Sequence, residues 1–165
     1  MACITIFRVA AAAVFLAGAC TTTVAAVTRT PYQAFARRTC VSATGCQVDF
    51  PRVGANLRIE IDSASCHMTG DFSPSSFAAR ARPDYLQLVV TTPAANYVAG
   101  VLLVPKEVGA AGGSGPGPGT ITYASSNQLF AFASSGQKFQ ILLGPLTGTF
   151  HALACSISGE TVKLS

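Results

Sequence analysis

The feature that most constrains the fold is a two-residue alternation of apolar and polar side chains in short segments bounded by glycine or proline. In residues 57–62, Leu57, Ile59 and Ile61 alternate with charged residues, and residues 149–158 form the longest such run. Successive side chains of a β-strand point to opposite faces of its sheet, so this period is typical of a strand with one buried and one wet face. The pattern therefore predicts an all-β protein.

The spacing of these segments predicts the architecture. We expect about eight short strands, at residues 46–50, 57–62, 85–91, 97–104, 120–124, 128–133, 138–143 and 149–158, with 160–164 continuing or re-entering the sheet. Such spacing, without helix–strand alternation, is typical of a single antiparallel β-sandwich, jelly-roll-like or immunoglobulin-like, with a small β-barrel as the alternative. We expect residues 85–91 and 97–104 to form a hairpin and the polar stretch 67–83 to be a loop. Cys66 needs a bulge near Ser63 and Ala64 to point inward.

An apolar run near the N-terminus predicts that the chain is exported, to the periplasm or outside the cell. Residues 9–19 follow Arg8 and carry no charge, and their length fits a signal peptide better than a membrane span. Small residues favour cleavage after Ala26, with Ala25 as the alternative. We predict a signal peptide at 1–26, an irregular arm at 27–39, and a β-sandwich at 40–165 with a flexible Gly/Pro loop at 108–119. Lipidation of Cys20, which would anchor the protein to a membrane, is a further alternative.

The cysteines of the expected mature chain indicate disulfide bonds. Four remain after cleavage, and an even number in an exported domain is the usual disulfide pattern. Four cysteines allow three pairings, of which we favour Cys40–Cys46 across a turn-like segment and Cys66–Cys155 between an early and the last strand. Zinc sites need closely spaced cysteine pairs, which the sequence lacks, so no metal site or cofactor is expected.

The charge balance is mildly basic and does not indicate a nucleic-acid partner. The chain has 11 Lys and Arg against 7 Asp and Glu, and loss of Arg8 with the leader would leave a net charge of +3. Nucleic-acid-binding proteins usually concentrate basic residues on one face, whereas here Arg37 and Arg38 form the only adjacent basic pair. We expect a solvated surface that keeps the protein soluble.

Short strand, turn and cysteine motifs carry a resemblance to other proteins. The pattern is Cys46-x-x-x-Phe50-Pro51-x-Val53, then Leu57-x-Ile59 and Ser65-Cys66, and finally Cys155-x-Ile157-Ser158-Gly159. It resembles a pattern in many small exported bacterial proteins of unknown function and spans most of the expected mature chain. The resemblance implies a secreted β-sandwich with a disulfide, and it implies no activity or catalytic residue.

Two sets of residues are candidates for catalysis. His67 precedes Asp71 and lies near Ser73, Ser75 and Ser76, which is the residue set of a Ser–His–Asp device, although no G-x-S-x-G elbow is present. Glu60 and Asp62 share one strand face about 7 Å apart, a spacing compatible with a glycosidase. Ion pairing with Arg58 is the simpler interpretation of these carboxylates. With Asp49 they could hold calcium, but no acidic calcium loop is present.

The remaining candidates are aromatic or lie at the edge of the core. Tyr85, Tyr97, Tyr123 and Phe130 could form a sugar- or peptide-binding platform, or simply pack in the core. His151 shares the parity of Leu153 and Cys155, so we expect it at the core edge. The sequence favours a non-catalytic binding or envelope-structural module, with a glycan, a peptide or an envelope protein as the possible partner. A small secreted hydrolase is the alternative, and a subunit built by strand exchange would require an open groove.

Overall fold

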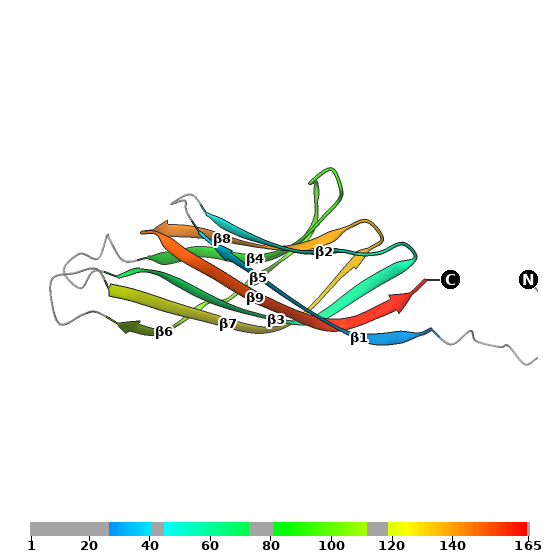
Figure 1. The fold of residues 1–165 in the computed structure, drawn as a ribbon, viewed down its shortest axis with the longest axis horizontal. Coiled ribbons are helices and arrows are strands. Elements are labelled where there is room, and N and C mark those ends of the chain that lie inside the picture. The colour runs from blue at the N-terminus through cyan, green and yellow to red at the C-terminus, as the bar shows by residue number, and fades with distance from the viewer. Residues whose placement is uncertain (1–26, 41–44, 73–80, 112–118, 165) are drawn as a thin grey trace, which may run out of the picture.

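The fold consists of two antiparallel sheets packed face to face, without helices in the described residues (Figure 1). The computed structural model describes residues 27–40, 45–72, 81–111 and 119–164. The five-stranded sheet has the order β1-β9-β3-β7-β6 and the four-stranded sheet the order β2-β8-β4-β5. The strands are β1 (Arg29–Thr39), β2 (Cys46–Arg52), β3 (Leu57–Phe72), β4 (Arg82–Thr91), β5 (Tyr97–Leu103), β6 (Lys106–Ala111), β7 (Gly119–Ser134), β8 (Lys138–Thr147) and β9 (Phe150–Lys163).

This architecture confirms the predicted single β-sandwich, and the sheets do not close into a barrel. The core lies between the sheets because alternate side chains of both point inward. Its largest fully buried members include Ile61, Met68, Ile121, Leu153 and Ile157 from the five-stranded sheet, and Leu86, Leu88, Phe139, Ile141 and Leu143 from the four-stranded sheet. Burial of such a side chain contributes about 1.5–3 kcal/mol. Within the described part of the chain, no helix is long and apolar enough to cross a membrane.

The N-terminal segment corrects one prediction. Instead of an irregular arm, Arg29–Thr39 is an eleven-residue edge strand that pairs with β9 from Arg29–Val162 to Thr39–Ala152. Its inward residues Tyr32, Ala34 and Ala36 pack against the core. Pro31 is tolerated because an edge strand has one side on which no backbone donor is needed. The predicted signal peptide and the lipidation candidate Cys20 lie outside the described residues.

Two predicted loops are also partly strands. Residues 67–72 continue β3 rather than beginning a loop, and the rest of that prediction is described only from Ala81 onward. Val108–Ala111 of the predicted Gly/Pro loop belong to β6 and Gly119 begins β7, and the remaining residues 112–118 lie outside the described residues. The segments 120–124 and 128–133 form one long strand, β7, with an irregular register opposite β3.

Both favoured disulfides are present. Cys66 on β3 lies directly opposite Cys155 on β9, with the Cα atoms 4.1 Å apart. The predicted bulge explains this placement, because the register of β3 shifts between Ile61 and Ser63 and turns Cys66 into the core. The Cys40–Cys46 disulfide joins the end of β1 to the start of β2, and thereby one sheet to the other. Two disulfides indicate an oxidising, extracytoplasmic environment.

Candidate functional site

The outer face of the four-stranded sheet carries the most distinctive group of exposed side chains. Gln47 of β2 pairs with Leu142 of β8, Leu142 with Gln87 of β4, and Gln87 with Leu102 of β5. This register places amide and apolar side chains alternately in one row across the sheet. Directly paired residues of neighbouring strands point to the same face, so the row forms a continuous strip.

Two tyrosines belong to the same face. Tyr85 lies on β4 and is 41% exposed, whereas Tyr97 begins β5 and is 67% exposed. Tyr97 pairs with Thr91 after a register shift at the end of the β4–β5 hairpin, which rises away from the two layers (Figure 1). The backbone of this hairpin therefore positions Tyr97, while the irregular pairing of β4 with β8 near Pro83 positions Tyr85.

Glycines allow two of these side chains to lie flat on the sheet. Tyr85 pairs with Gly144, and a Cβ at Gly144 would overlap the tyrosine ring. In the same way, a Cβ at Gly100 would overlap the amide of Gln87. Glycine in a strand interior commonly marks a place where another group approaches the backbone closely. Because these two glycines have no side chains, the Tyr85 ring and the Gln87 amide lie close to the backbone of the sheet, and one side of the Tyr85 ring stays exposed.

The face is hollowed by two adjoining depressions. One, of about 380 Å³, reaches from Tyr85, Tyr97 and Leu142 to the Cys40–Cys46 disulfide. The other, of about 400 Å³, is lined by the same three residues together with Gln87, Val89 and residues 98–100. Val89 is buried on this face without belonging to the core between the sheets. The two tyrosines thus share one hollow with an apolar floor and amide groups. We name this hollow, lined by Tyr85, Tyr97, Leu142, Gln47 and Gln87, the tyrosine face.

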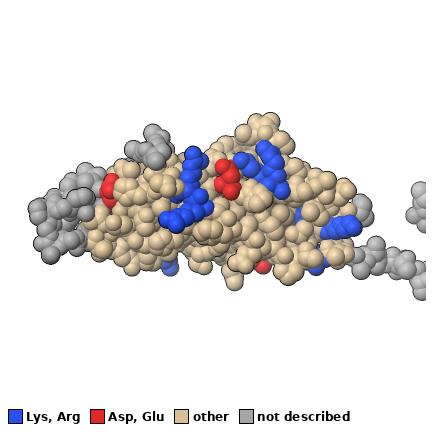
Figure 2. All heavy atoms as spheres, viewed as in Figure 1, with Lys and Arg blue, Asp and Glu red and all other residues tan. Residues whose placement is uncertain are grey.

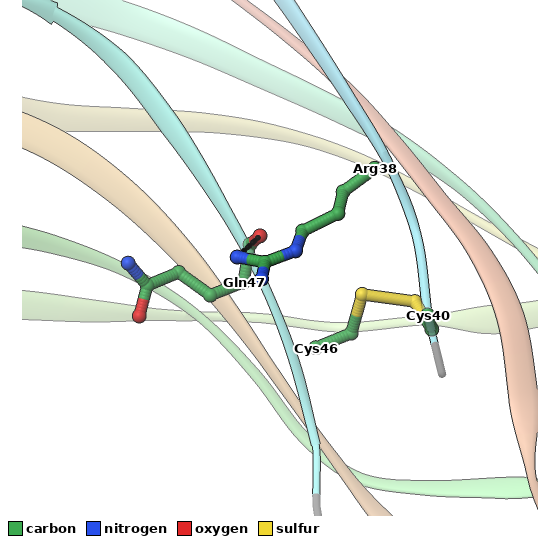
Figure 3. Close-up of a disulfide and its surroundings, with 4 residues drawn as sticks. All are labelled: Arg38, Cys40, Cys46 and Gln47. Atoms are coloured by element: carbon green, nitrogen blue, oxygen red, sulfur yellow. Dashed lines mark hydrogen bonds between the residues drawn. A yellow bond between two sulfur atoms is a disulfide. The ribbon is translucent and has the colours of Figure 1, made fainter. Parts of the chain in front are cut away.

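Arg38 and the first disulfide form one rim of the tyrosine face (Figure 3). Arg38 extends from β1 toward β2, where its Nη1 donates a hydrogen bond to the backbone oxygen of Gln47 at 3.4 Å. The Cys40–Cys46 bond lies beside this contact and fixes the distance between the two strands. The side chain of Gln47 points away from the disulfide, so its amide is carried along the outer face.

Beyond Gln47, the same face carries a hydrogen-bonded carboxylate. Asp49 Oδ1 accepts hydrogen bonds from Gln47 Nε2 at 3.0 Å, Lys138 Nζ at 2.6 Å and Gln140 Nε2 at 2.5 Å. Partial burial acts to raise the pKa of Asp49, but these donors, Lys138 first, outweigh it and hold the pKa below its ordinary value. Asp49 is therefore a fixed anion that orients Gln47 and Gln140.

The charged groups do not merge into a basic surface on the side of the molecule seen in Figure 2. There, Lys and Arg side chains form separate small groups, with acidic side chains between some of them. Such spacing gives no strong field of one sign that would attract a polyanion.

The histidines are arranged differently from the sequence-based prediction. Asp71 contacts His151, with Oδ1 2.6 Å from Nε2, and not His67. His151 is exposed rather than at the core edge because β3 and β9 shift register there: Thr69 pairs with Ala152 and Gly70 with Phe150, which leaves His151 in a bulge. The predicted nucleophiles Ser73, Ser75 and Ser76 lie outside the described residues.

The two carboxylates proposed for glycosidase chemistry have different partners. Glu60 accepts a hydrogen bond from Arg29 at 2.9 Å and forms an ion pair with Arg58. Burial acts to raise the pKa of Glu60, but Arg29 and Arg58 outweigh it and lower the pKa. Asp62 instead accepts a hydrogen bond from Ser158 at 3.4 Å. Glu60 is thus held in its charged form, which suits an ion-pair network better than proton transfer.

The proposed calcium ligands do not come together. Asp49 lies on β2 in the four-stranded sheet, whereas Glu60 and Asp62 lie on β3 in the five-stranded sheet. Among the described residues, no group of three or more His, Cys, Asp and Glu side chains is placed to hold a metal ion.

The four aromatic candidates divide into three environments. Tyr85 and Tyr97 share the tyrosine face. Tyr123 is buried and donates a hydrogen bond to the backbone oxygen of Ala81 at 3.0 Å. Phe130 lies on β7 in the other sheet, against Phe132. Sequence reasoning missed Arg38, Gln47 and Gln87. The two glutamines could have been found from the sequence, because both occupy outward-facing positions on strands that were correctly predicted.

Comparisons with known proteins add no relative: no family model, no curated protein and no solved structure matches this chain. The assignment of function therefore depends on the geometry of the chain's own residues. Two exposed tyrosine rings, one of them flat on the sheet, with neighbouring amides and an apolar floor can bind a ligand that has both an apolar face and hydroxyl groups.

Proposed function

We propose that this chain is an exported, non-catalytic binding module that binds a carbohydrate on the tyrosine face. The observation that carries the proposal is the shared hollow of Tyr85 and Tyr97, two exposed rings that flank amide side chains. A pyranose ring has an apolar C–H face that packs on an aromatic ring, and hydroxyl groups that exchange hydrogen bonds with amides. Tyrosine suits this role because it combines a large apolar surface with a polar tip.

Preorganisation supports this assignment. Tyr85 is held flat over Gly144, and Gln47 is oriented by Asp49, so neither side chain needs to lose much freedom on binding. Ordering a flexible side chain at an interface costs about 0.5–1.5 kcal/mol, and a prearranged surface avoids part of that cost. The two disulfides support export, because such bonds form and persist in oxidising compartments outside the cytoplasm.

The experiment is a binding screen with the oxidised protein. Cello-, chito-, manno- and xylo-oligosaccharides and soluble peptidoglycan fragments are titrated by calorimetry and by tyrosine fluorescence. The chain has no tryptophan and four tyrosines, so the fluorescence of Tyr85 and Tyr97 adds only to that of Tyr32 and Tyr123 and is not hidden by a brighter tryptophan. We expect one class of sugar to bind, and Tyr85→Ala or Tyr97→Ala to weaken its binding about tenfold or more, which is about 1.4 kcal/mol.

Two further variants sharpen the test. Gly144→Ala keeps the tyrosine but lifts its ring from the sheet, so we expect it to weaken the same sugar. Phe35→Ala is the matched control, because Phe35 is 68% exposed on β1 in the other sheet and should leave binding unchanged. Absence of binding to the whole panel, or binding that survives both tyrosine substitutions, would refute the carbohydrate assignment. Release of new reducing ends from the bound sugar would refute the non-catalytic assignment.

A further inference from the structure

The second half of β7 has an unpaired backbone edge. β7 pairs with β3 along almost its whole length, but β6 covers its other side only from Thr120 to Ala124. Beyond that point no described strand pairs with the side of β7 that faces away from β3. We name residues 127–134 of β7 the open edge; its last residue, Ser134, is already hydrogen-bonded to Gln137 through its backbone N–H and oxygen. Unpaired N–H and C=O groups on such an edge are a template for another strand.

The composition of the open edge differs from that of three other sheet edges. Edge strands of monomeric proteins are usually protected by charged residues or proline. β1 carries Arg29 and Pro31, β2 carries Asp49 and Pro51, and β6 carries charges at its start. Residues 127–134 (NQLFAFAS) contain neither a charge nor a proline. β5, which lies on the same side of the sandwich, is also uncharged.

Apolar surface accompanies the unpaired backbone. Phe130 and Phe132 are 72% and 52% exposed, with ring centroids 6.4 Å apart. Next to them a cavity of about 180 Å³ opens between β7 and β5, and its walls include Leu88, Val90 and Val98. Contiguous exposed apolar surface of this kind is typical of sites that bind another protein, a membrane or a ligand.

We infer that the open edge pairs with the open edge of a second copy of this chain, antiparallel and around a two-fold axis at Ala131. This register places Phe130 of each copy opposite Phe132 of the other, so the two exposed ring pairs form one aromatic ladder. On the inward side Leu129 faces the partner's Ala133 and Ala131 faces the partner's Ala131, so no two large side chains face each other. Aromatic cross-strand pairs are among the more favourable in antiparallel sheets.

Charge favours a second copy as the occupant. The chain is positively charged as a whole, yet the open edge presents no charge that would repel an identical edge. Arg58 lies over the Phe132 ring at 5.8 Å from its centroid, but it is already paired with Glu60. An antiparallel edge is complementary to itself, and a two-fold contact closes without leaving a further open edge of the same kind.

The size of the contact sets the expected affinity. The exposed parts of the two phenylalanines amount to about 250 Å² per copy, from a side-chain surface of about 150–250 Å² each. A standard interface buries about 800 Å² per partner, so the open edge and the adjoining cavity together form a modest interface. We expect a dimer with a dissociation constant in the micromolar range.

Sedimentation velocity of the oxidised protein from about 5 to about 500 µM, a range that brackets a micromolar Kd, tests this inference. We expect a concentration-dependent dimer, weakened about tenfold or more by Phe130→Lys, which places a charge opposite the partner's Phe132. Phe35→Lys, at an exposed aromatic position on β1, is the matched control and should not change association. Far-UV circular dichroism checks that both variants are folded.

Cysteine pairing tests the register independently. Phe130→Cys and Phe132→Cys lie opposite one another only across the proposed two-fold axis, so a mixture of the two variants should form a cross-linked dimer under mild oxidation. Each variant alone should cross-link much less. A protein that is monomeric over the whole concentration range, or a dimer that Phe130→Lys leaves unchanged, would overturn the inference. Neither result would refute binding of a sugar to a single tyrosine face, which lies on the other sheet.

Discussion

Removal of the Cys66–Cys155 disulfide should destabilise the fold much more than removal of Cys40–Cys46. The two bonds differ mainly in the length of chain that they close. Cys66 and Cys155 are 89 residues apart in sequence, and the loop between them contains β4 to β8, which is all of the four-stranded sheet except β2. Cys40 and Cys46 are only 6 residues apart.

The magnitude follows from the conformational entropy of the unfolded chain. Closing a loop of about 90 residues stabilises the folded state by about 4.6 kcal/mol in the chain-entropy model, against about 2.3 kcal/mol for about seven residues. Replacement by alanine also leaves a small cavity at each site. All four cysteines are buried, at 1–9% exposure, so this second cost is similar for the two pairs. The difference of about 2.3 kcal/mol therefore isolates loop closure.

The assay is urea unfolding of the two double variants and the parent protein, followed by far-UV circular dichroism. The free energy of unfolding in water is compared at matched slopes, because a changed slope would indicate a changed unfolded state. We expect Cys66→Ala/Cys155→Ala to lose about 2 kcal/mol more than Cys40→Ala/Cys46→Ala. Equal losses, or a larger loss for the shorter loop, would refute loop closure as the main contribution of these bonds.

Two further predictions concern the sheets themselves. The pKa of Asp49 is lowered in the folded state, so its contribution is present above its unfolded pKa, about 3.9, and is lost as the pH falls through the folded value. Asp49→Asn should therefore lose less stability than the parent between neutral and strongly acidic pH, as measured by urea unfolding at each pH. Gly159→Ala should destabilise the protein by about 2 kcal/mol or more, because the new Cβ would overlap the backbone of Glu60 and Ile61. Gly109→Ala, where no atom lies within 4 Å of the new Cβ, should stay within about 0.5 kcal/mol of the parent in the same assay.

The alternation of apolar and polar residues predicted most of the fold because most strands have one solvent-exposed face and one buried face. Where it failed, the inward residues gave a weak signal. β1 buries only two alanines and part of Tyr32 against the core, and Pro31 suggests a break in the strand although an edge strand tolerates it. Near the end of β3, Gly70 suggests a turn when only the sequence is considered. In the structure it lies in the strand, where a Cβ would come within 2.5 Å of the Ala81 Cβ.

The tyrosine face could be predicted only in its parts. The sequence indicates that Tyr85 and Tyr97 lie on the strands of one hairpin, but their shared hollow depends on register shifts near Pro83 and between Val90 and Thr91. The choice of histidine partner fails for the same reason, because a bulge at His151 brings it to Asp71. Bulges re-aim side chains, and a two-residue pattern cannot show where an extra residue enters a strand.

The tyrosine face and the open edge lie near opposite lateral sides of the sandwich, and the two sides differ in how the sheets are joined. On one side the Cys40–Cys46 disulfide ties β1 to β2 and forms a rim of the tyrosine face. On the other side the chain crosses from β5 to β6, and because β6 pairs only with Thr120 to Ala124 of β7, the remaining edge stays open. A two-fold axis through that edge, perpendicular to the sheet, would turn both tyrosine faces in the same direction. Two modest sites directed at one surface bind a polymer more tightly than either site alone, so dimerisation would favour a polysaccharide over a short sugar.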